Sequence, residues 1–102
     1  MSERDEGQPS FHLIGAGGAG MSVVAQLLAA QGARVTGSDR QDSDFLTALR
    51  NQGLEVYYPH GARDFDPDAT VVLSSAIRDD NVELVQLRRS EERFSRNAET
   101  DL

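Results

Sequence analysis

The sequence predicts an α/β domain built on a doubly wound parallel sheet, and three observations support this prediction. The run from Phe11 to Ser22 joins an apolar strand-like segment to a glycine-rich loop and then to an apolar helix. Short apolar runs then alternate along the chain with segments of helical period. The run 69–74 has an unbroken apolar centre, which is typical of a strand buried on both faces. Right-handed crossovers between such strands give the order 3-2-1-4, a Rossmann-like arrangement.

The first third of the chain predicts a strand, a helix and a second strand. Residues 1–9 are polar and have no period, so we expect a disordered leader before the domain. Residues 10–14 read as the first strand. A helix over 19–31 follows, because its apolar residues fall on one stripe, and Gly32 stands where a C-terminal cap belongs. Residues 34–37 read as the second strand.

The middle of the chain predicts a helix over 44–52, which Asp42 or Ser43 caps at its start. The residues expected to face the core are Phe45, Leu46 and Leu49. Residues 54–57 read as the third strand, and 59–68 as a loop with at most one helical turn.

The last third predicts the fourth strand, over 69–74, and a helix that begins near Val82 after a cap at Asp80 or Asn81. The expected core-facing residues of this helix are Val82, Val85 and Leu87 or Arg88. The domain therefore spans 10–87. Residues 88–102 contain four basic and four acidic residues with few apolar anchors, so we expect a charged helical or disordered tail.

The composition excludes several classes of function. A chain of 102 residues has room for one domain. It has no cysteine, which excludes disulfides and zinc thiolate sites and makes the cytoplasm the expected location. The net charge of -7 argues against a nucleic-acid partner, and no apolar stretch approaches the ~18 residues of a membrane span. All ten basic residues are arginines, so a P-loop lysine for the β/γ-phosphates of ATP is impossible.

The glycine loop predicts a site for a diphosphate. Gly15, Gly17 and Gly20 have the G-x-G-x-x-G spacing, in which the first glycine permits a tight turn and the second lets backbone approach a pyrophosphate. The third lets the helix pack closely on the strand. Backbone N–H groups from Gly18 to Ser22 would bind the diphosphate at the positive end of the helix, and the Ser22 hydroxyl is a further candidate donor. The alternative interpretation is a tight turn that binds nothing.

Other candidate residues follow the remaining strands. Asp39 ends the second strand, where an acidic side chain accepts hydrogen bonds from ribose hydroxyls. Arg40 could instead bind a 2′-phosphate, and Ser38 suits a nucleotide with or without this phosphate. The residues after the second strand therefore do not identify the ligand. His60 would overlook the same crevice, although a surface-loop histidine is the plainer interpretation. The segment 74–77 would reach the crevice from its other wall.

Nothing in the sequence indicates catalysis or a metal. Ser74 and Ser75 have no histidine and acid at the spacing of a nucleophilic site. Asp79 and Asp80 are adjacent residues before a helix, which are more typical of caps than of metal ligands. We therefore predict no catalytic and no metal-binding residue.

Four motifs together resemble the N-terminal domain of the Mur ligase family: Gly15 to Ser22, Gly37-Ser38-Asp39, His60-Gly61 and Ser74 to Ile77. The resemblance covers roughly 11–87 and is strongest to the ligases that join L-alanine to UDP-N-acetylmuramate. It implies that the domain binds the UDP part of this sugar nucleotide in a cytoplasmic enzyme of peptidoglycan biosynthesis. ATP and Mg²⁺ would act in the complete enzyme, and this chain alone would bind no cofactor and form no amide bond.

The resemblance also implies the residues of the UDP-binding site. The matching histidine of the family lies near the uracil, and the matching glycines lie at the diphosphate. The implied set is Gly15, Gly17, Gly18, Ala19, Gly20, Met21, Ser22, Ser38, Asp39, His60, Ser74, Ser75, Ala76 and Ile77.

The chain departs from the family pattern after Leu87. The family adds a fifth strand with a Gly-Ile-Pro-Val-like core, whereas this chain continues directly with Arg88-Arg89-Ser90-Glu91. We therefore expect the fifth strand to be missing, which would expose the edge of the strand at 71–73 and favour a homodimer through it. Two other functions remain open, an NAD(P)-binding regulatory module and an interaction module that binds no nucleotide.

Overall fold

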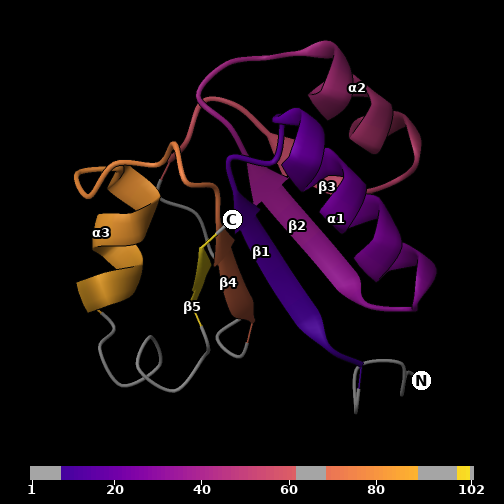
Figure 1. Ribbon diagram of the computed structural model, residues 1–102, viewed down its shortest axis with the longest axis horizontal. Helices are drawn as coiled ribbons and strands as arrows, with labels where there is room; N and C mark the ends of the chain where they lie inside the picture. The colour runs from indigo at the N-terminus through magenta and orange to yellow at the C-terminus, as the bar shows by residue number, and fades with distance from the viewer. Residues whose placement is uncertain (1–7, 62–68, 90–98, 102) are drawn as a thin grey trace.

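The computed structural model describes residues 8–61, 69–89 and 99–101 and contains a single sheet of five parallel strands (Figure 1). The order of the strands is β3-β2-β1-β4-β5, so the predicted order 3-2-1-4 is confirmed. The strands are β1 (Ser10–Ile14), β2 (Arg34–Ser38), β3 (Glu55–Tyr57), β4 (Thr70–Leu73) and β5 (Glu99–Asp101). The helices are α1 (Ala19–Ala30), α2 (Asp44–Asn51) and α3 (Val82–Arg89).

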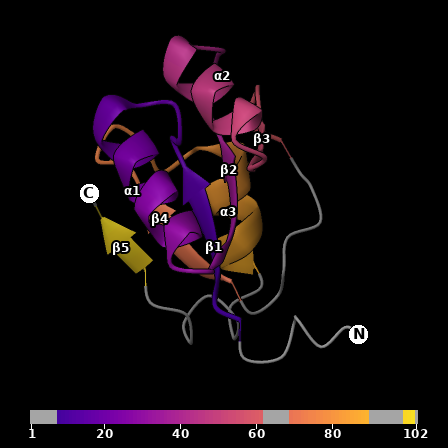
Figure 2. The same cartoon turned by 90° about the vertical axis from the view of Figure 1, so that its right-hand side faces the viewer.

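Helices cover both faces of the sheet. Helices α1 and α2 lie on one face and α3 lies on the other (Figures 1 and 2). Because successive strand residues point to opposite faces, Leu13 packs with α1 and α2 whereas Ile14 packs with α3. The cluster on the first face consists of Leu13, Ala16, Met21, Ala25, Val35, Leu46, Leu49 and Val72. The cluster on the second face consists of Ile14, Val71, Leu73 and Leu84.

The strand register brings the loops after three strands together. Ile14, at the end of β1, pairs with Ser38 at the end of β2 and with Leu73 at the end of β4. The carboxyl ends of these strands are therefore level, which is where open α/β sheets bind their ligands.

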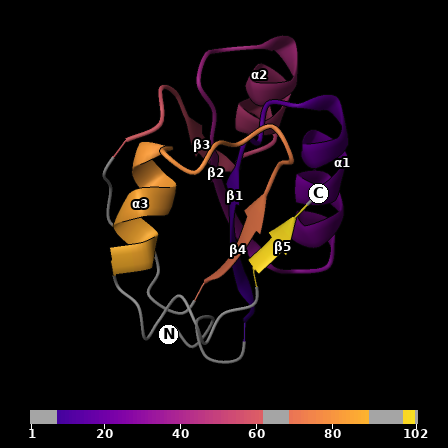
Figure 3. The same cartoon turned by 60° about the vertical axis from the view of Figure 1, so that its left-hand side comes forward.

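The sheet has a fifth strand, and the expectation that it was missing is wrong. Strand β5 pairs in parallel with β4, with Val71 opposite Glu99 and Leu73 opposite Asp101 (Figure 3). A parallel ladder is made by backbone groups, so an edge position can accept a segment without an apolar signature. Strand β4 is consequently an interior strand, and the predicted homodimer through its edge loses its premise. Of the tail expected over 88–102 as helical or disordered, residues 88 and 89 end α3, 99–101 form a strand instead, and 90–98 lie outside the described residues.

Two expected core faces are also wrong in part. The side chains of Val82 and Val85 on α3 are 55% and 37% exposed, while Glu83 and Leu84 are buried. On α2, Leu46 and Leu49 are fully buried as predicted, but Phe45 is 47% exposed. Both helices have only eight residues, which is too short for an apolar stripe to define their orientation.

The predicted helix caps fit the structure. The Ser43 side chain accepts a hydrogen bond from the backbone N–H of Leu46 and caps the start of α2. Gly32 and Gly53 follow α1 and α2 with φ of +92° and +91°, a conformation that glycine adopts without strain. Of the expected leader, residues 1–7 lie outside the described residues, whereas the Gln8 side chain donates to the carbonyl of Gly32 at 2.9 Å.

Candidate functional site

A cleft of about 410 Å³ opens at the carboxyl ends of the strands. It brings together residues from the glycine loop, from the loops after β2 and β3, and from the segment between β4 and α3. The predicted site residues that line it are Gly15, Gly17, Gly18, Asp39, His60, Ser74, Ala76 and Ile77. Four motifs far apart in the sequence thus form one surface.

The start of the glycine loop is fixed by Gly15. Its φ is +98°, and a side chain there would lie 2.7 Å from Cβ of Ser74. The backbone N–H groups of Gly15 and Ala16 both donate to the carbonyl of Ser38, at 2.8 Å each. The turn therefore requires glycine. The turn is hydrogen-bonded to the end of β2 on one side and packs against Ser74, which follows β4, on the other.

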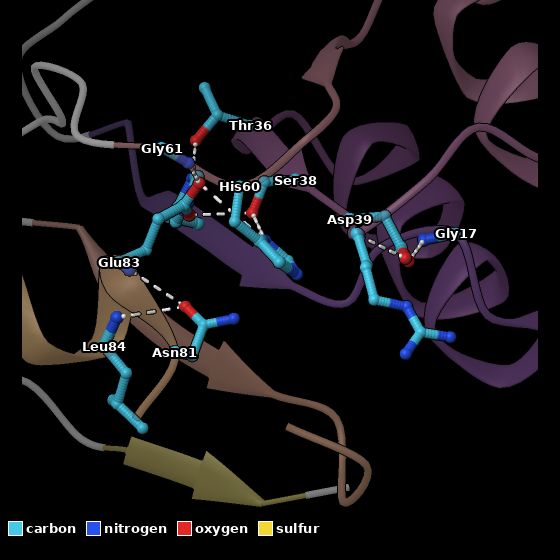
Figure 4. A network of polar contacts seen from close by, with 11 residues as sticks. Gly17, Thr36, Ser38, Asp39, His60, Gly61, Asn81, Glu83 and Leu84 are labelled. Carbon is cyan, nitrogen blue, oxygen red and sulfur yellow. Dashed lines mark hydrogen bonds and ion pairs between the residues drawn. The ribbon is translucent and has the colours of Figure 1, made fainter. Parts of the chain in front are cut away.

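Asp39 holds the middle of the loop. Its Oδ2 accepts a hydrogen bond from the backbone N–H of Gly17 at 2.7 Å, and its Oδ1 accepts one from the N–H of Arg40 at 2.6 Å (Figure 4). A Cβ at Gly17 would lie 2.9 Å from both Asp39 Oδ2 and Ser43 Oγ. Carboxylate oxygens have further lone pairs, so Asp39 can still accept from a ligand hydroxyl in the cleft.

The N-terminus of α1 presents a narrower set of donors than the sequence suggested. The N–H of Gly18 donates to the Gly15 carbonyl at 3.3 Å, and that of Ser22 donates to the Gly18 carbonyl at 2.9 Å. Among the described residues, the N–H groups of Ala19, Gly20 and Met21 have no acceptor, because they precede the first intrahelical bond. The Ser22 hydroxyl is buried and donates to the Ala19 carbonyl instead of facing the cleft.

The close packing expected of Gly20 belongs to another glycine. Apart from its chain neighbours and the backbone of its own helix, no atom lies within 4 Å of a Cβ built at Gly20, so the helix does not need glycine there for contact with the sheet. A Cβ at Gly37 would lie only 2.7 Å from Cβ of Ala16 and 3.2 Å from the Leu13 carbonyl. Gly20 fits the spacing of the motif, but Gly37 is the glycine that lets β2 and the glycine loop approach each other closely.

His60 faces the cleft from the loop after β3. Its Nδ1 lies 2.8 Å from Oγ of Ser38, which is itself buried behind the cleft wall. Burial of the ring lowers the pKa of His60 below its ordinary value of 6.5, against the opposing attraction of Glu83 and Asp39. The ring is therefore neutral at physiological pH.

A buried carboxylate beneath the cleft was missed by sequence analysis. Glu83 of α3 is 0% exposed and accepts hydrogen bonds from Ser38 Oγ at 2.7 Å, Gly61 N–H at 2.8 Å and His12 Nε2 at 3.0 Å (Figure 4). The other ring nitrogen of His12 lies 2.7 Å from Oγ1 of Thr36. The polar residue His12 in the centre of an apolar strand was the one available signal, because a buried histidine needs a partner.

Burial alone would raise the pKa of the Glu83 carboxyl. The hydrogen bonds from His12, Ser38 and the Gly61 backbone outweigh it and hold the pKa of Glu83 below its ordinary value. Glu83 is therefore ionised and acts only as an acceptor.

The other wall of the cleft is a turn between β4 and α3. Ser74 accepts hydrogen bonds from Ala76 N–H at its hydroxyl and from Ile77 N–H at its carbonyl. Ser75 is exposed and does not line the cleft. Asn81 caps α3 by accepting from the N–H groups of Glu83 and Leu84.

Arginine supplies the cationic groups of the cleft. Arg40 and Arg78 line it from opposite walls, and Asp80 lies 3.7 Å from Arg78 in an exposed ion pair. Exposed pairs of this kind are weak, so Arg78 remains able to turn toward an anion. Among the described residues, no group of three or more His, Cys, Asp or Glu side chains is arranged to hold a metal ion.

Comparison with known proteins gives one family. Residues 10–99 match the family model described as "Mur ligase family, catalytic domain". The chain is 53% identical over 76 residues to the UDP-N-acetylmuramate–L-alanine ligase of Streptomyces avermitilis. It is 49% identical over 77 residues to the ligase of the same name from Thermobifida fusca, and 42% identical over 79 residues to that from Persephonella marina. These matches cover 74% to 78% of this chain.

A solved structure has the same fold. The UDP-N-acetylmuramate–alanine ligase of Thermotoga maritima superimposes on 90% of this chain with a TM-score of 0.77 and 33% sequence identity. The chain spans only 16% to 20% of the length of these relatives. No helix in the part of the chain that the structure describes is long and apolar enough to cross a membrane.

Proposed function

This chain belongs to the Mur ligase family, and on that premise we propose that its cleft binds the UDP part of UDP-N-acetylmuramate. The observation that supports this most directly is the group of N–H donors of Ala19, Gly20 and Met21, which lack acceptors among the described residues. They stand at the positive end of α1, where a diphosphate is favoured by both hydrogen bonding and the helix dipole.

The remaining cleft residues have complementary roles in this proposal. Asp39 accepts a hydrogen bond from a ribose hydroxyl, and His60 and the turn at 74–77 contact the nucleoside from opposite walls. Arg40 and Arg78 add positive charge beside the diphosphate. In a chain of net charge -7, these local cations matter for an anionic ligand.

The catalytic step is proposed for the complete ligase only. Amide formation between UDP-N-acetylmuramate and L-alanine would use ATP and Mg²⁺, for peptidoglycan biosynthesis. The glycine loop here is not a P-loop and the chain has no lysine, so its residues do not fit the β/γ-phosphates of ATP. This domain would bind and orient the sugar nucleotide.

Ligand-detected NMR on the chain tests the proposal. UDP-N-acetylmuramate and UDP-N-acetylglucosamine are expected to bind and to compete with each other, while ATP is not expected to bind. NADH serves as the discriminating ligand, because a G-x-G-x-x-G loop followed by Asp39 also suits a dinucleotide. Preferential binding of NADH would overturn the proposal in favour of a dinucleotide module, and binding of none of the four would overturn it in favour of an interaction module.

A further inference from the structure

The hydrogen bonds under the cleft determine which nitrogen of His60 carries its proton. Glu83 is ionised and can only accept, so the Ser38 hydroxyl must donate its one proton to Glu83 Oε1 at 2.7 Å. Ser38 Oγ can then only accept in its 2.8 Å contact with Nδ1 of His60. The proton of the neutral imidazole therefore lies on Nδ1, and Nε2 has a free lone pair.

We propose that Glu83 is a positioning residue that acts through Ser38 to keep His60 in the Nδ1–H tautomer, so that Nε2 serves the cleft as a hydrogen-bond acceptor. Its ligand would be a donor group of the bound nucleoside, either the imide N–H of the base or a ribose hydroxyl. The identity of the ligand rests on the proposed function, whereas the tautomer follows from contacts within the chain.

The rest of the network makes this arrangement rigid. Glu83 is fully buried on α3, and its Oε2 also accepts from the N–H of Gly61, the residue next to His60. The same carboxylate therefore positions both the ring of His60 and the backbone that carries it. His12, which is 1% exposed, donates to Oε1, the oxygen that also accepts from Ser38, and this second donor helps to hold the carboxylate in place.

An acceptor at this point selects among nucleotides. The diphosphate at pH 7 presents only acceptor oxygens, so it gains nothing from Nε2. A base with a ring N–H, such as uracil, can donate to Nε2, whereas cytosine has an acceptor at the corresponding ring nitrogen and would face it unfavourably. The network beneath the cleft thus contributes to the choice of nucleoside instead of to phosphate binding.

The tautomer can be measured without any ligand. The chain has only two histidines, so long-range ¹H–¹⁵N spectra at pH 8, assigned with a His12→Gln variant, resolve the ring of His60. We expect Nδ1 protonated and Nε2 unprotonated. In Ser38→Ala the ring loses its hydrogen-bond partner at Nδ1, where Glu83 Oε2 is 3.8 Å away and beyond hydrogen-bond distance, so the spectrum should shift toward a mixture of tautomers. Thr36→Val is the matched control, because it removes a hydroxyl from the same strand that contacts His12 and the Phe11 carbonyl but not His60.

A Glu83→Gln variant tests the carboxylate itself. The amide places an NH₂ group against either Ser38 and His12 or the N–H of Gly61, and in the first arrangement the Ser38 proton turns toward His60. We then expect the ring to change to the Nε2–H tautomer, which a merely structural role for Glu83 would not produce. A wild-type ring in the Nε2–H tautomer, or unchanged spectra in both Ser38→Ala and Glu83→Gln, would overturn the assignment.

Ligand analogues separate the two possible donors. Methylation at the imide nitrogen of UDP-N-acetylglucosamine or removal of a ribose hydroxyl should weaken binding about tenfold, according to which group meets Nε2. In His60→Phe the same analogue should bind as the parent does. Equal affinity of all analogues for the wild type would overturn the acceptor role while leaving UDP binding intact. Failure of the parent to bind would instead overturn the proposed function, and the ligand part of this inference with it.

Discussion

Gly17 and Gly20 belong to one motif, but their surroundings differ. A methyl group at Gly17 would press on Asp39 and Ser43 and displace the carboxylate that holds the loop. We expect Gly17→Ala to lower the affinity for a UDP-sugar by about tenfold or more, since one charge-assisted hydrogen bond is worth about 1.5–3 kcal/mol. Titration by NMR measures this, and circular dichroism checks that the fold persists. Unchanged affinity in a folded variant would mean that the loop is only a turn.

A methyl group at Gly20 has a different expected effect. Apart from its chain neighbours and the backbone of α1, it meets no atom within 4 Å, and it stands in the first turn of α1. We expect Gly20→Ala to raise the free energy of unfolding by about 0.5–1 kcal/mol, because alanine loses less backbone entropy than glycine in a helix. Urea denaturation measures the change. A destabilised variant would indicate a contact that the structure does not contain.

His60 and Glu83 should make the domain less stable in acid. The pKa of His60 is lowered in the fold, so below about 6.5 the unfolded chain binds a proton that the folded chain does not. Stability therefore falls as the pH drops from 6.5 through the folded pKa. The pKa of Glu83 is also lowered, so a second loss begins below 4.5.

Urea denaturation between pH 8 and pH 3 measures this dependence. The difference in unfolding free energy between wild type and His60→Gln isolates the histidine from the 17 carboxylate side chains of the chain. The unfolding free energy of wild type minus that of His60→Gln should decrease as the pH falls from 7 to 5. An increase in this quantity over the same range would contradict a lowered pKa for His60.

At the scale of the element, α3 gives the sharpest contrast between neighbours. Leu84 is 1% exposed and packs with Ile14, Val71 and Leu73, whereas Val85 is 37% exposed. We expect Leu84→Ala to lower the free energy of unfolding by about 2–5 kcal/mol and Val85→Ala to change it by about 0.5 kcal/mol or less. Equal effects of the two substitutions in denaturation experiments would mean that α3 packs on the sheet with the face that carries Val82 and Val85.

The elements also show what could be predicted from sequence. The strand, glycine loop and helix from Phe11 onward were predictable because local spacing specifies them, and so were the caps at Ser43 and Gly32. The inner face of α3 was not, since a buried Glu83 is stabilised by partners on β1 and β2 that are remote in sequence. Strand β5 could not be predicted from the sequence, because its pairing depends on the backbone of β4 and not on an apolar pattern.

For the whole molecule, the sequence limits what the chain can do by itself. It has no lysine. We expect the purified chain to show no ATP hydrolysis and no ligation of alanine, because its glycine loop lacks the lysine that binds the β/γ-phosphates of ATP in a P-loop. A coupled phosphate-release assay tests this, and turnover that is retained in Gly17→Ala would point to a contaminating enzyme. Turnover that is lost in that variant would contradict the expectation.

The sheet as a whole depends on β5 to cover an apolar strand. Val71, Val72 and Leu73 of β4 are buried, and β5 pairs along all three. Deleting residues 99–102 would leave the backbone groups of β4 unpaired at an edge without lysine or proline, which is a template for another strand. We therefore expect the shortened chain to associate as its concentration rises, and the full chain not to associate through β4. Sedimentation velocity at several concentrations measures both. In the shortened chain, Thr70→Lys at the half-buried start of β4 should reverse the association without placing a charge in the core. A monomeric shortened chain at high concentration would show that β4 needs no cover, and association of the full chain that Thr70→Lys abolishes would show that the edge of β4 is open in the full chain.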